Sequence, residues 1–175
     1  MKMTRITAWA ASATVAAAIA VPVAAAPASA AENAITFACA EPPFPSAESD
    51  FFVKIKAPLI VFKGRDIDLD VTLTSAEPTK FDLPANGING SIDVKVGGSV
   101  QTTVTATGLT NPAIVPAGQQ VALPGGAARV PASKVGIYTF RPDKFELHTF
   151  FGTTLACTPT APTAISAITV TVLAP

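Results

Sequence analysis

The sequence predicts an all-β fold, and three observations carry this prediction. Apolar residues recur at every second position in short segments, whereas the spacing of an amphipathic helix is nearly absent. Prolines and glycines separate these segments, and both residues commonly mark strand ends and turns. Two cysteines, Cys39 and Cys157, stand near opposite ends of this β-rich region. Short alternating strands with frequent turns are typical of a sandwich or barrel.

The first 30 residues have the pattern of a secretory signal peptide. Lys2 and Arg5 precede an apolar run over residues 6–20, and small residues lead up to Ala30. We therefore expect residues 1–30 to be removed on export, so that no membrane span remains. A membrane anchor is the alternative, but prolines follow the run and no basic flank stops transfer.

The remaining residues, 31–175, are predicted to form one domain that is long enough to bury a substantial core. Removing the leader takes away two basic residues and no acidic residue, which leaves 10 basic against 12 acidic residues. Phosphate backbones and anionic lipids are bound through excess positive charge. The net charge therefore argues against nucleic acid as a partner and gives no overall attraction to anionic lipid.

The two cysteines are predicted to form one disulfide, because an exported protein folds in an oxidising compartment. A bridge between Cys39 and Cys157 ties the first predicted strand to the penultimate one and encloses most of the domain. In the chain-entropy model, a loop of this length stabilises the fold by about 4 to 5 kcal/mol.

Strands in the first half are predicted from alternation between breaks. A strand over residues 34–40 ends at a run of prolines, and a second covers 51–57. The clearest covers 65–74, where Ile67, Leu69, Val71 and Leu73 alternate with Asp66, Asp68, Asp70 and Thr72. This alternation predicts one buried face and one wet face.

The second half begins with a predicted hairpin. Strands around residues 92–96 and 100–106 flank Gly97-Gly98, and the preceding Asn86-Gly87 pair marks a loop that tolerates positive φ. Residues 107–134 are the least regular and give one short candidate strand, 120–123. Further strands are expected at 135–140, 144–151, 153–157 and 168–173, with a turn at 141–143 between the first two. We expect eight or nine strands in total.

Three stretches of the chain resemble a known group of proteins: Phe37-Ala38-Cys39, Leu155-Ala156-Cys157 and the segment 140–147. With their spacing, they resemble the secreted immunoglobulin-like domains of unknown function of actinobacteria. The resemblance implies an immunoglobulin-like antiparallel β-sandwich with a disulfide between terminal strands, and it brings no known activity or site residues. Antibody-type bridges instead cross two central strands beside a buried Trp, and the single Trp here, Trp9, lies in the leader.

Asp66, Asp68 and Asp70 are the sharpest candidates for a metal site, because calcium prefers several carboxylate oxygens. Residues two apart in a strand lie about 6.5 to 7 Å apart, which is too far for these three to converge on one ion unaided. We therefore favour a solvated strand face, paired across the sheet with Lys54 and Lys56. A calcium site stays the alternative.

Catalytic groups are not evident. His148 is the only histidine, and zinc sites need three or four ligands, which the bridged cysteines do not supply. No G-x-S-x-G motif accompanies it. We expect no catalytic residue, no resident metal and no cofactor.

Two phenylalanine doublets, Phe51-Phe52 and Phe150-Phe151, place one ring each on the outer side of a strand, because consecutive residues face opposite ways. We expect the segment 107–134 to cover these outer rings; an exposed apolar contact surface is the alternative. The contact-surface candidates are Phe52, Glu146, His148 and Phe150, the last three forming one mixed row.

Together these features predict a secreted, non-catalytic binding or structural module of the bacterial cell envelope or the extracellular space. Its partner is expected to be a protein or the cell wall. Two alternatives stay open. One is a carbohydrate-binding module assisted by calcium at the acidic strand, and the other is a small secreted hydrolase whose site is not identified.

Overall fold

The computed structural model describes residues 28–29, 34–42, 45–161 and 167–175. In this part of the chain the protein is all-β, with eleven strands and no helix, so the predicted fold class is confirmed at that level. Among these residues, no helix is long and apolar enough to cross a membrane. Of the predicted leader, the structure describes residues 28–29, and the rest lies outside the described residues. The strands are β1 (Ala28–Ser29), β2 (Ala34–Ala40), β3 (Ala47–Ala57), β4 (Ile60–Phe62), β5 (Asp66–Pro78), β6 (Ile88–Gly98), β7 (Thr102–Thr110), β8 (Gln120–Pro131), β9 (Gly136–Thr149), β10 (Thr154–Pro159) and β11 (Ile168–Leu173).

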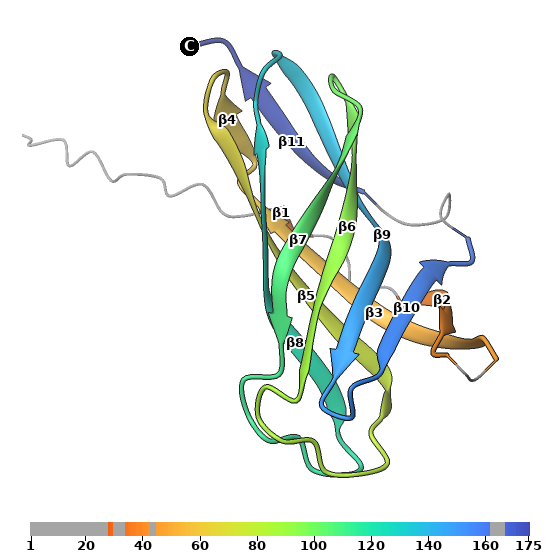
Figure 1. Cartoon of the computed structure of the whole chain (residues 1–175). Coiled ribbons are helices and arrows are strands. Elements are labelled where there is room, and N and C mark those ends of the chain that lie inside the picture. The colour runs from red at the N-terminus through yellow and green to blue at the C-terminus, as the bar shows by residue number, and fades with distance from the viewer. Residues whose placement is uncertain (1–27, 30–33, 43–44, 162–166) are drawn as a thin grey trace, which may run out of the picture.

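All strands belong to one continuous hydrogen-bonded sheet (Figure 1). The order is β10-β2-β3-β5-β8-β7-β6-β9-β11-β4, with β1 paired to β3. β10 also pairs with β9, so the hydrogen bonding returns to its start and eight of the described strands form a closed circuit. Pairing is antiparallel except between β4 and β11. The sheet thus folds over on itself and encloses its own core.

The core lies between the facing parts of this sheet and follows the predicted alternation. On β5, Ile67, Leu69, Val71 and Leu73 are at most 3% exposed, while the intervening aspartates face solvent. Three rings, Phe37, Phe51 and Phe145, pack edge to face with centroids 4.8 to 5.9 Å apart. Aromatic pairs favour this geometry, and these rings join β2, β3 and β9.

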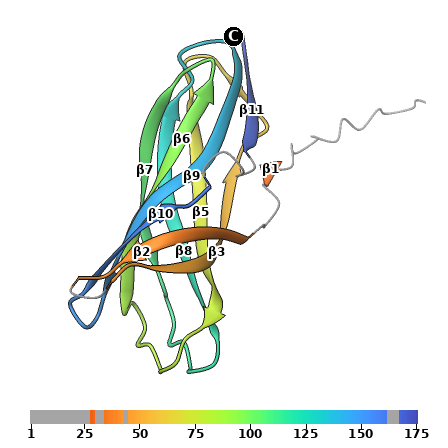
Figure 2. The same cartoon turned by 90° about the vertical axis from the view of Figure 1, so that its right-hand side faces the viewer.

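The disulfide between Cys39 and Cys157 is present, as predicted. The two cysteines lie directly opposite each other in the β2–β10 pair, with Cα atoms 4.0 Å apart. Both are buried. Figure 2 shows β2 and β10 side by side near the lower half of the molecule. The bridge therefore joins neighbouring strands rather than crossing the core.

The segment predicted to be irregular, 107–134, contains a long strand instead. β8 continues to Pro131 and pairs with β5 along most of its length. The register shifts between Val71 and Leu73, opposite Pro124 and Gly125. A bulge at this point needs no amide donor from Pro124, and Gly125 takes a φ of 87°. The prediction of an irregular segment failed because proline and glycine occur in bulges as well as in turns.

The turn predicted at 141–143 is likewise a bulge inside β9. Ile92 pairs with Phe145 but Val94 pairs with Pro142, so β9 carries one extra residue. Pro142 and Phe145 point inward and are buried, which leaves Asp143 and Lys144 both on the outer side. The predicted strands 135–140 and 144–151 are therefore one strand.

Candidate contact surface

The β9–β10 turn and the loop from Thr79 to Gly87 both lie at the lower end of the molecule (Figure 1). A groove of about 350 Å³ opens between them. Its volume falls within the range of small-ligand sites, roughly 300–1,000 Å³. Three aromatic rings border the groove, and aliphatic side chains continuous with the core form its floor. The rings are Phe81, Phe150 and Phe151, and the floor residues are Leu83, Ile88 and Val121.

Backbone hydrogen bonds hold the two segments that carry these rings. The amide of Phe150 donates to the carbonyl of Gly87 at 2.7 Å, which fixes the β9–β10 turn to the neighbouring loop. Within the turn, the Gly152 amide donates to Thr149 at 2.9 Å. Gly152 has a φ of 81°, a conformation that glycine adopts without strain. The rings are therefore presented by a fixed backbone.

Asn111 supports the floor of this end from inside. It is 1% exposed and is the one buried polar side chain found among the described residues. Its side-chain oxygen accepts from the Ile88 amide at 2.8 Å. Its amide group donates to the carbonyls of Pro84 and Ala113 at 2.7 and 3.0 Å. A buried amide with all these bonds stabilises a loop that lacks a regular ladder.

The three rings remain accessible. Phe81, Phe150 and Phe151 are 51%, 46% and 62% exposed. The Phe81 and Phe151 rings meet edge to face at 5.6 Å, and Phe150 and Phe151 lie 3.9 Å apart at a tilt of 35°. Charged side chains, Glu41, Glu77 and Lys80, also line the groove. The arrangement is an apolar patch with a polar rim, which on soluble proteins commonly marks a contact surface.

The expectation that residues 107–134 cover the outer phenylalanines is wrong for the second doublet. Phe150 and Phe151 are both exposed: that segment forms the end of β7 and all of β8, and Val115 and Gly118 between them bond the loop that carries Phe81. In the first doublet, Phe51 is buried and Phe52 is half-buried on the outer face of β3. The doublet Phe150-Phe151 therefore fits the alternative, an exposed apolar surface.

The four predicted contact residues do not form one surface. Phe150 borders the groove, whereas Glu146 and His148 lie on the outer face of β9. His148 Nδ1 lies 2.9 Å from the Thr154 hydroxyl on β10. Phe52 lines a different hollow beside Lys54 and Thr74. Alternation correctly placed Glu146 and His148 outward, but it could not show that the strand ends before Phe150.

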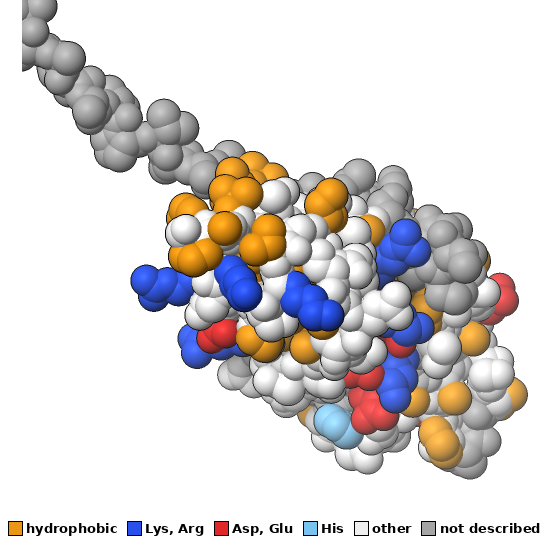
Figure 3. Space-filling model, turned by 90° about the horizontal axis from the view of Figure 1, so that it is seen from above, with side chains coloured by type: hydrophobic (Ala, Val, Ile, Leu, Met, Phe, Trp, Pro, Cys, Tyr) orange, Lys and Arg blue, Asp and Glu red, His pale blue; other side chains and the backbone are white. Residues whose placement is uncertain are grey.

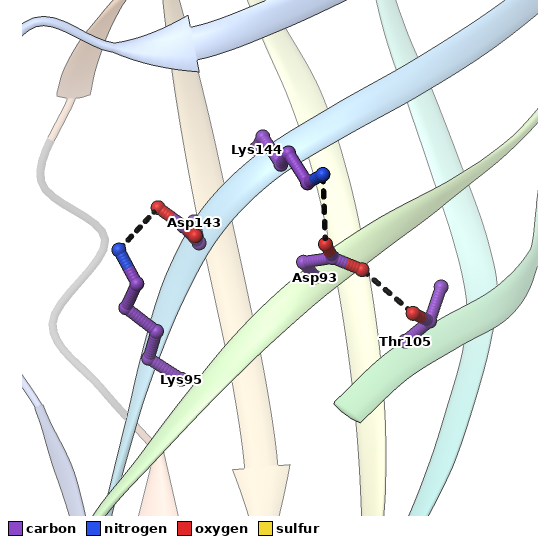
Figure 4. A network of polar contacts seen from close by, with 5 residues as sticks. All are labelled: Asp93, Lys95, Thr105, Asp143 and Lys144. Carbon is purple, nitrogen blue, oxygen red and sulfur yellow. Dashed lines mark hydrogen bonds and ion pairs between the residues drawn. The ribbon is translucent and has the colours of Figure 1, made fainter. Parts of the chain in front are cut away.

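Glu146 lines the same hollow as Asp93, Thr105 and Lys144. Those three residues belong to a polar network beside the β9 bulge (Figure 4). Lys95 Nζ contacts Asp143 at 2.9 Å, and Lys144 Nζ lies 3.7 Å from Asp93. The Thr105 hydroxyl donates to the other oxygen of Asp93 at 2.6 Å. Each carboxylate is thus engaged by a neighbour, and the network is explained by the packing of β6, β7 and β9.

The aspartates of β5 are exposed on its outer face. Asp68 pairs with Arg129 of β8 at 3.0 Å, rather than with the lysines expected from the sequence. Lys56 stands opposite Asp70 in the β3–β5 register. No group of three His, Cys, Asp or Glu side chains that could hold a metal ion occurs in the part of the chain that the structure describes.

Neither Phe81 nor Phe151 is among the contact residues predicted from the sequence. Phe81 stands alone in a polar loop between Lys80 and Asp82, and an isolated aromatic residue in such a loop is the signal that was available. Phe151 is followed by Gly152, which marks a turn rather than a strand. No protein-family model matches this chain, and no curated protein is similar to it in sequence.

Proposed function

We propose that this protein is an exported, non-catalytic binding module that recognises its partner through the aromatic groove. The observation that carries the proposal is the exposure of Phe81, Phe150 and Phe151 together on a fixed backbone. Large apolar rings cost free energy when they remain in water, and binding removes that cost. Aromatic residues are also enriched at the centres of protein interfaces.

Export is part of the proposal. The N-terminal pattern of residues 1–30 is that of a secretory leader, and a buried disulfide suits an oxidising compartment. We place the protein in the extracellular space or at the cell wall of a bacterium. The resemblance to actinobacterial secreted domains belongs to the same proposal.

We further propose that the sheet is a divergent immunoglobulin-like sandwich. The antiparallel pairing and the core between facing parts of the sheet support this assignment. Two features are unusual for such a domain: the bridge joins adjacent strands, and hydrogen bonds close the circuit through β2 and β10. The immunoglobulin-like assignment can be tested with an experimentally determined structure. It would be overturned if that structure kept the β9–β10 and β2–β10 ladders but paired the other strands differently.

The ligand that fits the groove is an apolar group with polar surroundings. The floor and the three rings offer an apolar contact, while Glu41, Glu77 and Lys80 supply charges of both signs at the rim. This chemistry suits an apolar side chain of a protein segment, with polar backbone or side chains held at the rim.

Site-specific cross-linking tests the proposal. A photoreactive benzoylphenylalanine replaces Phe151 in the protein expressed and exported by its own cells, and a second form carries it at Thr103, an exposed position on β7. We expect a discrete cross-linked protein from position 151 alone. Equal labelling from both positions, or none from position 151, would contradict the groove as the recognition surface. A cross-link to a wall glycan would favour the carbohydrate-binding alternative.

A further inference from the structure

A second exposed apolar surface lies at the opposite end of the molecule, on the outer face of β4, β11 and β9. In the strand register, Ile137 stands opposite Thr171, which stands opposite Ile60. One step along the same face, Leu173 stands opposite Phe62. The inward residues between these positions, such as Val61, Val172 and Tyr138, are buried.

This outer face is unusually apolar for a sheet surface that is exposed in the described part of the chain. Ile60, Phe62, Ile137 and Leu173 are 52%, 54%, 55% and 40% exposed. Leu59 and Val135 flank them at 42% and 51%. An antiparallel sheet normally places polar residues on its solvated face. A contiguous apolar patch of this kind marks a docking surface. We call these six residues the upper patch.

Cations border the upper patch. Lys63 follows Phe62, and its amide donates to the carbonyl of Leu173 at 2.8 Å, which holds the turn against β11. Arg65 lies in the same turn, where its carbonyl accepts from the Ala132 amide at 2.9 Å. Lys134, next to Val135, donates its amide to the Tyr138 hydroxyl at 3.0 Å. Figure 3 shows hydrophobic side chains gathered at this end with Lys and Arg side chains beside them.

The local charge differs from the net charge. Lys63, Arg65 and Lys134 are exposed around the upper patch, and the acidic Asp66 follows Arg65 as the first residue of β5. The net charge of the chain, which gives no attraction to anionic lipid, does not reveal this local excess of positive charge. An apolar face with a cationic border is the pattern of surfaces that bind anionic lipid, where apolar groups enter the interface and cations contact headgroups.

The path of the chain points to the same partner. β1 pairs Ala28 with Ala57 of β3, two residues before Leu59, and it also lies near β11. The apolar run of residues 6–20 therefore joins the described domain beside the upper patch. While the leader is still attached during export, it would hold this end of the domain near the membrane; after its removal, the apolar face and its cations alone carry the contact.

We propose that the upper patch docks the domain on an anionic lipid surface. A second copy of the chain fits less well, because face-to-face pairing of two upper patches brings Lys63, Arg65 and Lys134 of both copies together. Like charges at close range disfavour such a contact, whereas anionic headgroups neutralise them.

Vesicle co-sedimentation tests this proposal with the full chain as its producing cells export it, the N-terminus being read by mass spectrometry. The probes are vesicles of phosphatidylcholine alone and of phosphatidylcholine mixed with phosphatidylglycerol. We expect preference for the anionic vesicles, weakened by high salt. Ile60→Ser with Phe62→Ser is expected to lower binding at least about tenfold. Lys63→Gln and Lys134→Gln are each expected to lower it about fivefold.

Phe151→Ser is the matched control, because it removes an equally exposed ring from the opposite end. It should leave vesicle binding unchanged, just as the upper-patch variants should leave cross-linking at position 151 unchanged. Circular dichroism melting confirms that each variant folds. Equal binding to both vesicle types, or equal binding by wild type and the Ile60/Phe62 variant, would overturn the proposal. So would light scattering that finds a dimer which the Ile60/Phe62 variant dissociates.

Discussion

The two ends of the molecule expose apolar side chains in different structural settings. At the lower end, Phe81 and Phe151 extend from turns and meet over a groove. At the upper end, Ile60, Ile137 and Phe62 stand on the regular face of three paired strands. A groove selects a ligand by shape, whereas a flat face with a charged border is suited to an extended surface.

The supports of the two ends also differ. The lower end depends on loop hydrogen bonds, on Asn111 and on the disulfide that holds β10 to β2. The upper end is held by the ladders that join β4, β11 and β9. Removing one of these supports should therefore loosen one end more than the other. Variants that each remove one support test this difference.

The largest effect is expected from Cys39→Ser with Cys157→Ser. Without the bridge, the unfolded chain regains the freedom of a very long loop, and stability should fall by about 4 to 5 kcal/mol. Denaturant unfolding measures the loss. Hydrogen exchange should rise first in β2, β10 and the β9–β10 turn, leaving the upper ladders protected. Uniform exchange at both ends would show that the bridge does not support the lower end selectively.

Phe145→Ala should cost about 4 kcal/mol, because it empties the space between Phe37 and Phe51. Phe151→Ala, six residues further along, should cost less than about 1 kcal/mol, because that ring is 62% exposed. Thermal unfolding of the two variants checks both values. A large loss from Phe151→Ala would mean that the groove is part of the core.

Asn111→Leu should cost about 3 kcal/mol, since it removes three side-chain hydrogen bonds and leaves the Ile88 amide and the Ala113 carbonyl without this partner. Asn89→Ala, which removes one exposed bond of 3.2 Å, is the control and should change stability little. Cross-linking at position 151 should fall in the first variant, because its loop supports the groove. If the Asn111→Leu variant loses the expected stability but still cross-links fully at position 151, the groove does not depend on Asn111.

Two glycines with similar backbone angles compare the ends directly. Gly98 has a φ of 87° and Gly118 a φ of 84°. A Cβ at Gly98 would collide with the Ile137 carbonyl oxygen next to the upper patch, whereas a Cβ at Gly118 meets nothing within 4 Å. Gly118→Ala should cost about 1 kcal/mol from backbone strain alone. Gly98→Ala should cost at least about 2 kcal/mol. Equal losses in denaturant unfolding would mean that β6 moves freely away from β9.

The smallest effect is expected at the acidic strand. Asp68→Asn removes an exposed ion pair with Arg129, and such pairs contribute less than about 1 kcal/mol. Neither end of the molecule should change its hydrogen exchange. We also expect millimolar calcium to leave the melting temperature of the wild type unchanged. A calcium-dependent increase that Asp68→Asn abolishes would establish a metal site on β5.

Sequence alternation predicted the strands whose two faces differ. β5 is the clearest case. The disulfide was predicted separately, because the chain has two cysteines and an oxidising compartment was expected. Alternation failed at Pro142 and Pro124, because a proline in a bulge and a proline in a turn look alike in sequence. β4 was missed since three residues are too few to show a period.

The candidate surfaces were harder to predict for a different reason. Phe150 was selected from its position in a row, and its true neighbours, Phe81 and Phe151, come from another loop and from the turn. The upper patch unites residues from β4, β9 and β11 that are up to 173 − 60 = 113 positions apart. Only the strand register reveals that Ile60 and Ile137 share a row.

The position of the bridge also limits how far the protein can be stretched. Cys39 and Cys157 are 118 residues apart in sequence, and a chain extends by about 3.5 Å per residue. A pulling force on the two ends reaches only the residues outside this loop while the bridge is intact. About 400 Å of extensible chain is thereby withheld. Tension applied through the two ends of the chain would therefore leave the fold between Cys39 and Cys157 intact while the bridge holds.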